Sequence, residues 1–272
     1  SEKYPDLTAI EKKLALLYGA EVAVDVSKSG EQQNLKIEIS CIDDRFAIDG
    51  ESISDECCEM LFELVFNPKL ENGVFEKNVV ESEKRLLCER LAAEKSDKRA
   101  YAKNRCEEIM FSDEVYGINR LGTIEAIEAV TPESLYDAYN ELLKTAVITM
   151  CVSGGRFSGA EKMFEAQMQN ISREPELNET LFVESAEDVQ YEKEQEDVKQ
   201  GKLVMGFRMG MKNIEDNYSA RRIMVDLFGG SPHSKLFTVV REKMSLCYYC
   251  SARMIRNKGV MFVESGIESY NE

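Results

Sequence analysis

The sequence contains a single histidine, His233, among 272 residues, and this scarcity limits the catalytic sites that it can form. Catalytic zinc sites commonly take two or three histidine ligands, and Ser-His-Asp or Cys-His arrangements use a histidine as the general base. His233 lies in a Gly-Gly-Ser-Pro-His stretch with no visible catalytic partner. We therefore expect it to be an exposed turn residue.

Long apolar runs and clusters of positive charge are also lacking. No stretch approaches the roughly 18 apolar residues of a membrane helix, and the start, Ser1 to Pro5, lacks the basic-then-apolar pattern of a signal peptide. The net charge of −16 opposes binding to a phosphate backbone. We expect neither a nucleic-acid nor a membrane partner, and the missing initiator Met suggests a processed chain or a fragment. The acidity indicates a solvated surface or, alternatively, a chamber that favours basic peptides.

The eight cysteines are scattered along the chain, which is too long to need disulfides for its stability. Cys247 and Cys250 form a C-x-x-C pair, but no second pair accompanies them. The pair falls in a strand-like run, whereas a redox pair typically opens a helix. We expect free thiols and a cytoplasmic location.

Apolar spacing and capping residues predict mixed helices and strands up to about residue 172. Asp6 caps a first helix, Ser29-Gly30 turns a β-hairpin with one buried face, and Asp97 and Thr131-Pro132 begin later helices. The other main elements expected here are a second helix from Ser54 to Val65, a long charged helix from Phe75 to Glu94 and an apolar strand from Ala146 to Val152.

The composition changes between Glu174 and Val198, where ten acidic residues accompany one lysine. We interpret this stretch as a solvated connector with a possible strand at Leu181–Val183. The 70 or so residues after it predict an α+β domain with helices on one face of the sheet. That domain stops directly after a strand and looks incomplete. Its expected strands and helices lie at 203–209, 218–228, 234–243, 248–254 and 260–266.

A long ordered string in the last part of the chain carries a family resemblance. Gly-Gly-Ser-Pro-His-Ser-Lys-Leu-Phe (229–237), Arg-Glu-Lys (241–243) and Leu-Cys-Tyr (246–248) resemble the second domain of insulinase/pitrilysin-type zinc peptidases, the inverzincins. Tyr-Gly-Ala (18–20), Phe-Asn-Pro (66–68), Tyr-Gly (116–117) and Thr-Pro (131–132) follow the order of the family's first domain.

The resemblance implies two tandem homologous α/β sandwich domains, each a mainly antiparallel sheet with helices packed on one face, and both truncated. The expected domains are residues 1–172, without the opening strands, an acidic linker at 173–199, and 200–272, without the C-terminal part.

Active relatives carry an inverted H-x-x-E-H motif, whose two histidines bind zinc and whose glutamate activates water. The motif cannot form in these residues, because the sequence has one histidine. The third zinc ligand of the family is a glutamate on the long helix, with another glutamate seven residues before it. The resemblance places Glu83 at the earlier position and Arg90 at the ligand position.

The charge of Arg90 opposes a metal at that position. A guanidinium about 4 Å from a divalent ion is repelled by roughly 8 kcal/mol at an effective dielectric near 20, whereas a carboxylate is attracted. The segment from Gly19 to Val24 also lacks the Asn and Thr that active relatives carry there. We therefore expect no metal and no catalytic residue in this chain.

The resemblance assigns a substrate-binding role to Arg241 and Tyr248, which in the family hold the peptide backbone near the scissile bond. It implies a non-catalytic subunit that lends this pair to a zinc-bearing homologue, as a heterodimer, or that forms a homodimer. Two alternatives stay open: a zinc peptidase whose H-x-x-E-H lies upstream of Ser1, and a peptide-binding or assembly protein without proteolysis.

Overall fold

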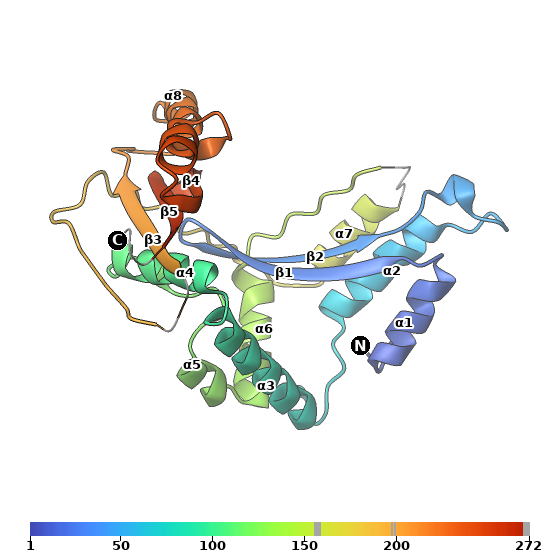
Figure 1. Ribbon diagram of the computed structural model, residues 1–272. Helices are drawn as coiled ribbons and strands as arrows, with labels where there is room; N and C mark the ends of the chain where they lie inside the picture. Colours follow the sequence, from blue (N-terminus) through green and yellow to red (C-terminus); the bar gives the residue numbers. More distant parts are fainter. Residues whose placement is uncertain (155–158, 197, 199, 269–272) are drawn as a thin grey trace. The chain divides into compact units, whose positions relative to one another are not determined.

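A computed structural model describes residues 1–154, 159–196, 198 and 200–268. Two compact units each combine separate stretches of the chain. Unit 1 comprises residues 1–27, 34–86 and 125–177, and unit 2 comprises 28–33, 87–124 and 178–272. The expected α+β class with antiparallel strands is confirmed (Figure 1). The expected boundaries of the two family domains, 1–172 and 200–272, stay a prediction.

Unit 1 contains several helices, and two of them begin with the capping chemistry expected from the sequence. The Asp6 carboxylate accepts a hydrogen bond of 2.8 Å from the Ala9 amide, and Thr131 forms a reciprocal capping box with Ser134. The core gathers around Ile53, which is 1% exposed. The elements with all or most of their residues in this unit are α1 (Leu7–Leu16), β1 (Glu21–Ser29), β2 (Gln32–Ser40), η1 (Asp44–Phe46), α2 (Ile53–Phe66), α3 (Lys77–Glu94), α5 (Ile124–Ala129), α6 (Pro132–Thr145) and α7 (Ala160–Gln169).

Strands β1 and β2 form the expected hairpin, with Gly30 at a positive φ of 58° in its turn. The expectation that one face is buried is wrong: neither strand has a buried residue, and Val24 is 64% exposed. The strand expected at Ala146–Val152 is also wrong, because that stretch is irregular. A strand needs a partner for its backbone N–H and C=O groups, and in the described ranges the hairpin forms a sheet of its own two strands.

Unit 2 is built around an antiparallel three-stranded sheet in the order β3-β5-β4. Each expected strand of this region is present, and the helix expected at 218–228 continues from α8 into the π-helical turn η3. Its elements are α4 (Lys98–Met110), η2 (Val115–Gly117), β3 (Gln200–Arg208), α8 (Tyr218–Val225), η3 (Asp226–Gly230), η4 (Leu236–Lys243), β4 (Cys247–Ile255), η5 (Arg256–Lys258) and β5 (Val260–Glu268).

The central strand β5 is buried on both faces. Phe262 is 0% exposed and packs in a cluster with Phe111 of the α4–η2 region. Val263, on the opposite face, is 3% exposed and packs with Val225 and Ala252. Helices cover one face of this sheet, as expected, and α4 packs on the other face. A strand covered on both faces reads as a continuous apolar run, as 260–263 does.

The acidic stretch after residue 177 is part of unit 2 and contacts the rest of that unit at several points. The Glu184 carbonyl accepts a hydrogen bond of 3.1 Å from the Gly210 amide, Glu194 pairs with Arg105 at 2.8 Å, and Glu196 pairs with Lys98 at 2.9 Å. The possible strand at Leu181–Val183 is absent, since these residues are irregular. The interpretation of the stretch as a solvated connector therefore does not hold at these contacts.

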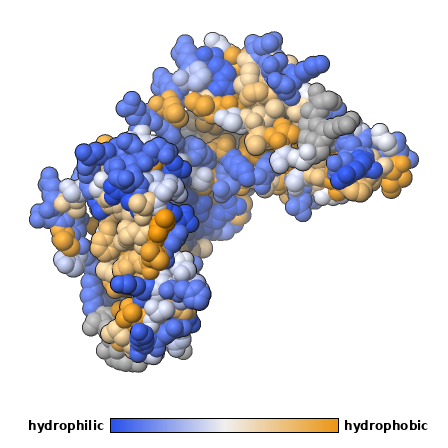
Figure 2. Space-filling view, turned by 90° about the horizontal axis from the view of Figure 1, so that it is seen from above, coloured by the Kyte–Doolittle hydropathy of each residue, from blue (hydrophilic) through white to orange (hydrophobic). Residues whose placement is uncertain are grey.

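Apolar side chains also reach the surface. Figure 2 shows them in orange among mostly hydrophilic residues on one face. In unit 2, Ile223 and Leu227 are 60% and 68% exposed and lie about one helical turn apart. The sheet of unit 2 therefore covers only some of the apolar side chains of α8 and η3. Among the described residues, no helix combines the length and apolar character that a membrane span needs.

The close approach of η3 to β4 generates a stability prediction at Gly229. A Cβ added there would lie 2.6 Å from the Cβ and backbone nitrogen of Ala252, which cannot both move aside. We expect Gly229→Ala to lower the free energy of unfolding by about 1–3 kcal/mol, as overpacking does, measured by urea denaturation.

The neighbouring Gly230→Ala is the matched control. Its Cβ would meet the Asp226 carboxylate, the movable end of a side chain, at 2.6 Å. The control should therefore lose less stability. Equal losses in the two variants would contradict the assignment of the contact to Gly229.

Candidate functional site

The glycine turn of the family motif connects η3 to η4, and its last residues form hydrogen bonds at the start of η4. Ser234 is 1% exposed; its amide donates to the Ser231 carbonyl at 3.0 Å, and its Oγ accepts from the Phe237 amide at 3.5 Å. His233 is exposed in this turn, so the expectation of an exposed turn residue is confirmed. The conspicuous Gly-Gly-Ser-Pro-His-Ser string has a local structural role.

Arg241 lies in the last turn of η4 and is exposed. Its guanidinium carbon sits 4.4 Å from the centre of the Phe237 ring, one helical turn earlier. This cation–π contact lays the side chain along the helix, while its planar N–H groups stay available at the surface.

Tyr248 sits at a bulge near the start of β4. Cys247 pairs with Ile267 and Tyr249 pairs with Gly266, so the register leaves Tyr248 as the extra residue. Tyr248 is 63% exposed. Bulges of this kind re-aim a side chain and are common beside functional sites.

The connection between Arg241 and Tyr248 has a fixed backbone. The Met244 amide donates to the Val239 carbonyl at 2.9 Å, and the Leu246 amide donates to the Val240 carbonyl at 3.1 Å. These bonds hold the chain where it leaves η4. In the described part of the chain, no hydrogen bond or ring contact joins the Arg241 and Tyr248 side chains. They are two separate polar groups on neighbouring elements of unit 2.

Two buried thiols flank the bulge. Cys247 and Cys250 are 8% and 6% exposed. Burial raises the pKa of the Cys250 thiol to about 11, and the hydrogen bond with Cys247 adds to this, although the charge of Arg241 acts in the opposite direction. A reactive C-x-x-C needs a lowered thiol pKa. The raised pKa opposes a redox role for the pair, which its position in a strand-like run also disfavours.

Glu83 and Arg90 both lie on α3 and are exposed. Seven residues make about two helical turns, which puts the two on the same side of the helix. Glu83 belongs to unit 1 and Arg90 to unit 2.

Zinc is the metal that the resemblance implies, and the donor set does not fit it. Across the described ranges, no group of three or more His, Cys, Asp or Glu side chains could hold a metal ion. The one histidine is exposed in the turn before η4, and a cation stands at the position assigned to the third ligand.

A set of buried charges surrounds Lys258 and was not predicted from the sequence. Lys258 is 0% exposed. A lysine between two strands ordinarily predicts a solvated turn, so its neighbours in sequence give no signal of this burial.

Comparisons with known proteins agree with the family resemblance. Residues 129–271 match a family model described as the peptidase M16 inactive domain. The chain is 31% identical over 276 residues to the probable inactive metalloprotease YmfF of Bacillus subtilis (strain 168), an alignment that covers 100% of this chain and 64% of that protein.

Solved structures are similar over nearly the whole chain. A conserved protein from Enterococcus faecalis V583 gives a TM-score of 0.83 at 27% identity, covering 99% of this chain and 64% of that one. A peptidase M16 inactive domain from Pseudomonas fluorescens gives 0.68 at 16% identity, covering 97% and 60%, and shows the fold alone. The chain thus spans about 64% of the length of the first two relatives.

The raised pKa of Cys250 predicts selective thiol labelling. At pH 8, a pKa of about 11 leaves about one thiolate in a thousand. We expect a maleimide to modify the exposed Cys151 rapidly and the buried Cys247 and Cys250 only slowly, as mapped by peptide mass spectrometry. The same labelling after denaturation in urea is the control. Rapid native labelling at Cys250 would contradict the prediction.

Proposed function

The chain belongs to the peptidase M16 family, and we propose that it contributes peptide binding, without catalysis, to a complex with a zinc-bearing homologue. Arg241 and Tyr248 are the residues that we assign to this binding. The observation that carries the proposal is an exposed Arg–Tyr pair on fixed backbone, in a chain whose residues do not fit a zinc site.

The chemistry of the pair suits a peptide backbone. A guanidinium presents planar N–H donors, and a phenol presents one O–H donor, so both can bind a carbonyl oxygen. Such donors stabilise the negative charge that the oxygen acquires during hydrolysis. Neither group can activate water for attack in the manner of a zinc-bound hydroxide.

The complex therefore needs a second source of catalysis. We propose a heterodimer with a zinc-bearing homologous subunit; the metal belongs to that subunit, and this chain binds no cofactor. A homodimer would lack the zinc and would bind peptide without cleaving it. The eight cysteines, all free, support a reducing compartment such as the cytoplasm.

Arg241→Ala tests the contribution to catalysis. The full-length protein would be mixed with the zinc-bearing M16 homologue of the same organism, and kcat/KM measured on a quenched fluorescent peptide. We expect a drop of roughly tenfold to a hundredfold, because one donor to the developing oxyanion is lost. Tyr248→Phe, which removes only the hydroxyl, should act in the same direction.

Arg222→Ala is the matched control. Arg222 is another exposed arginine of unit 2; it lies on α8 and pairs with Asp226 of η3 at 3.2 Å. It should leave kcat/KM unchanged. An unchanged rate in Arg241→Ala would reject the role of the pair, and an inactive mixture that still binds peptide would favour assembly without proteolysis.

Metal analysis of the intact protein tests the non-catalytic assignment separately. We expect far less than one zinc per chain by mass spectrometry of the metal content, because the resemblance places a cation, Arg90, at the position of the third ligand. Stoichiometric zinc that survives dialysis against a weak chelator would favour the alternative, a zinc peptidase with H-x-x-E-H upstream of Ser1.

A further inference from the structure

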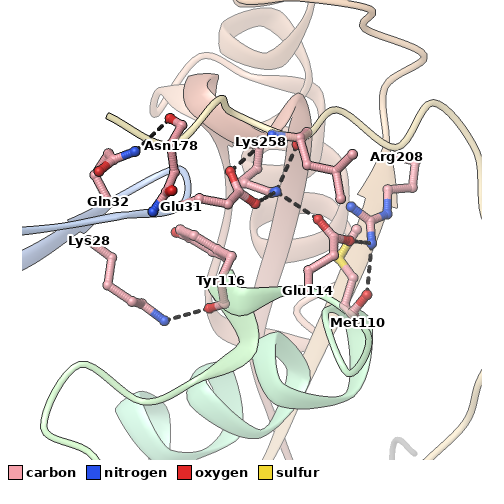
Figure 3. Close-up of polar contacts among 10 residues, drawn as sticks. Lys28, Glu31, Gln32, Met110, Glu114, Tyr116, Asn178, Arg208 and Lys258 are labelled. Carbon is pink, nitrogen blue, oxygen red and sulfur yellow. Dashed lines mark hydrogen bonds and ion pairs between the residues drawn. The ribbon is translucent and has the colours of Figure 1, made fainter. Parts of the chain in front are cut away.

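Lys258 is a charged residue at the centre of unit 2, in the short helix η5 between β4 and β5. Its side chain is 0% exposed. The ammonium pairs with the Glu31 carboxylate, lies 2.7 Å from the Glu114 carboxylate, and donates to the Leu181 carbonyl at 2.8 Å (Figure 3). One ammonium therefore holds three segments that are far apart in sequence.

A second buried pair continues the network. Arg208 of β3 lies 2.5 Å from Glu114 and donates to the Met110 carbonyl at 2.8 Å (Figure 3). The side chains of Arg208, Glu114 and Glu31 are 8%, 5% and 9% exposed. The two cations and two carboxylates balance, so the group is neutral as a whole, although each member alone would be a buried charge.

Residues 28–33, which we call the hairpin tip, make further contacts in the same region. Lys28 donates to the Tyr116 carbonyl at 2.8 Å, and Gln32 donates to the Asn178 carbonyl at 2.6 Å (Figure 3). A Cβ on Gly30 would lie 2.9 Å from Oγ1 of Thr180. The tip is thus covered closely by the chain around residue 180.

Residues 178–184, which we call the strap, form that cover. The Leu181 amide donates to Glu31 at 3.1 Å, while its carbonyl accepts from Lys258. The last backbone contact is the Gly210 amide with the Glu184 carbonyl, at 3.1 Å. The strap has irregular backbone, so these bonds, and not a strand ladder, hold it in place.

We propose that Lys258 is a latch that holds the hairpin tip and the strap against the sheet of unit 2, and that its loss frees both together. Glu31 is the joint between them, because its carboxylate binds Lys258 and the Leu181 amide. Removal of the ammonium leaves Glu31 and Glu114 buried without their shared cation, which is far more costly than the loss of a surface ion pair. Glu31 then reaches solvent only if the tip moves out.

When the latch is lost, we expect the strap to join the acidic residues after it as a free connector. The strap contains two acidic residues, Glu179 and Glu184, and Glu187 and Asp188 follow in an exposed stretch. Once freed, like charges repel and extend a connector of this kind. The device is independent of the proposed peptide-binding role, since it uses neither Arg241 nor Tyr248.

Hydrogen–deuterium exchange of the full-length protein tests the latch. In Lys258→Met, peptides that cover the tip and the strap should exchange about tenfold faster or more, because the local opening that exposes their amides becomes easier. Peptides that cover Val225 and Ala252 should be unchanged. Lys36→Met is the matched control, since Lys36 pairs with Glu38 at the surface, with 64% of its side chain exposed.

Glu31→Gln is the second variant, for use if Lys258→Met does not fold. It removes the charge at the joint but keeps the size of the side chain, and it should raise exchange in the tip and the strap by a smaller factor. Unchanged exchange in these segments would overturn the proposal. Faster exchange spread evenly over unit 2 would also overturn it, because the network would then serve global stability alone.

Discussion

The burial of β5 on both faces is the constraint around which unit 2 is organised. Its neighbours β3 and β4 take up its backbone hydrogen bonds, and the two helical layers cover its side chains. Met261 and Phe262, adjacent in sequence, therefore enter different cores. Because α4 supplies one of those layers, residues near 100 and near 262 lie in one compact unit, although the sequence alone assigns them to different expected domains.

Features set by local chemistry were predictable from the sequence. Asp6, Asp97 and Thr131 each cap the helix expected of them, because capping depends on a side-chain oxygen and the next three amides. Gly30 turns the hairpin for a similar reason. Features that depend on distant partners were not predictable. The apolar run at 146–152 has the composition of a strand, but pairing, which composition does not encode, decides whether a strand forms.

The candidate site likewise has features that the sequence predicts locally and features that depend on distant partners. The sequence located Arg241 and Tyr248 through the family motif, and the exposed state of His233 followed from its turn. It did not indicate that Tyr248 stands at a bulge, since a bulge is a property of the register between β4 and β5. Nor did it indicate the buried charges, because Glu31, Glu114 and Lys258 are separated by 83 or more positions and each is an ordinary surface residue by type.

Within the described residues, β3 and β4 are the edge strands of the sheet, whereas β5 has a strand partner on both sides. Further strands can join the sheet at either margin without disturbing its centre, because β3 and β4 each have a strand neighbour on one side only within the described residues. Changes at the edge strands should therefore reduce the stability of the sheet little. The residues of β5 have no such freedom, so mutational tolerance should fall from the rim of the sheet to its middle strand.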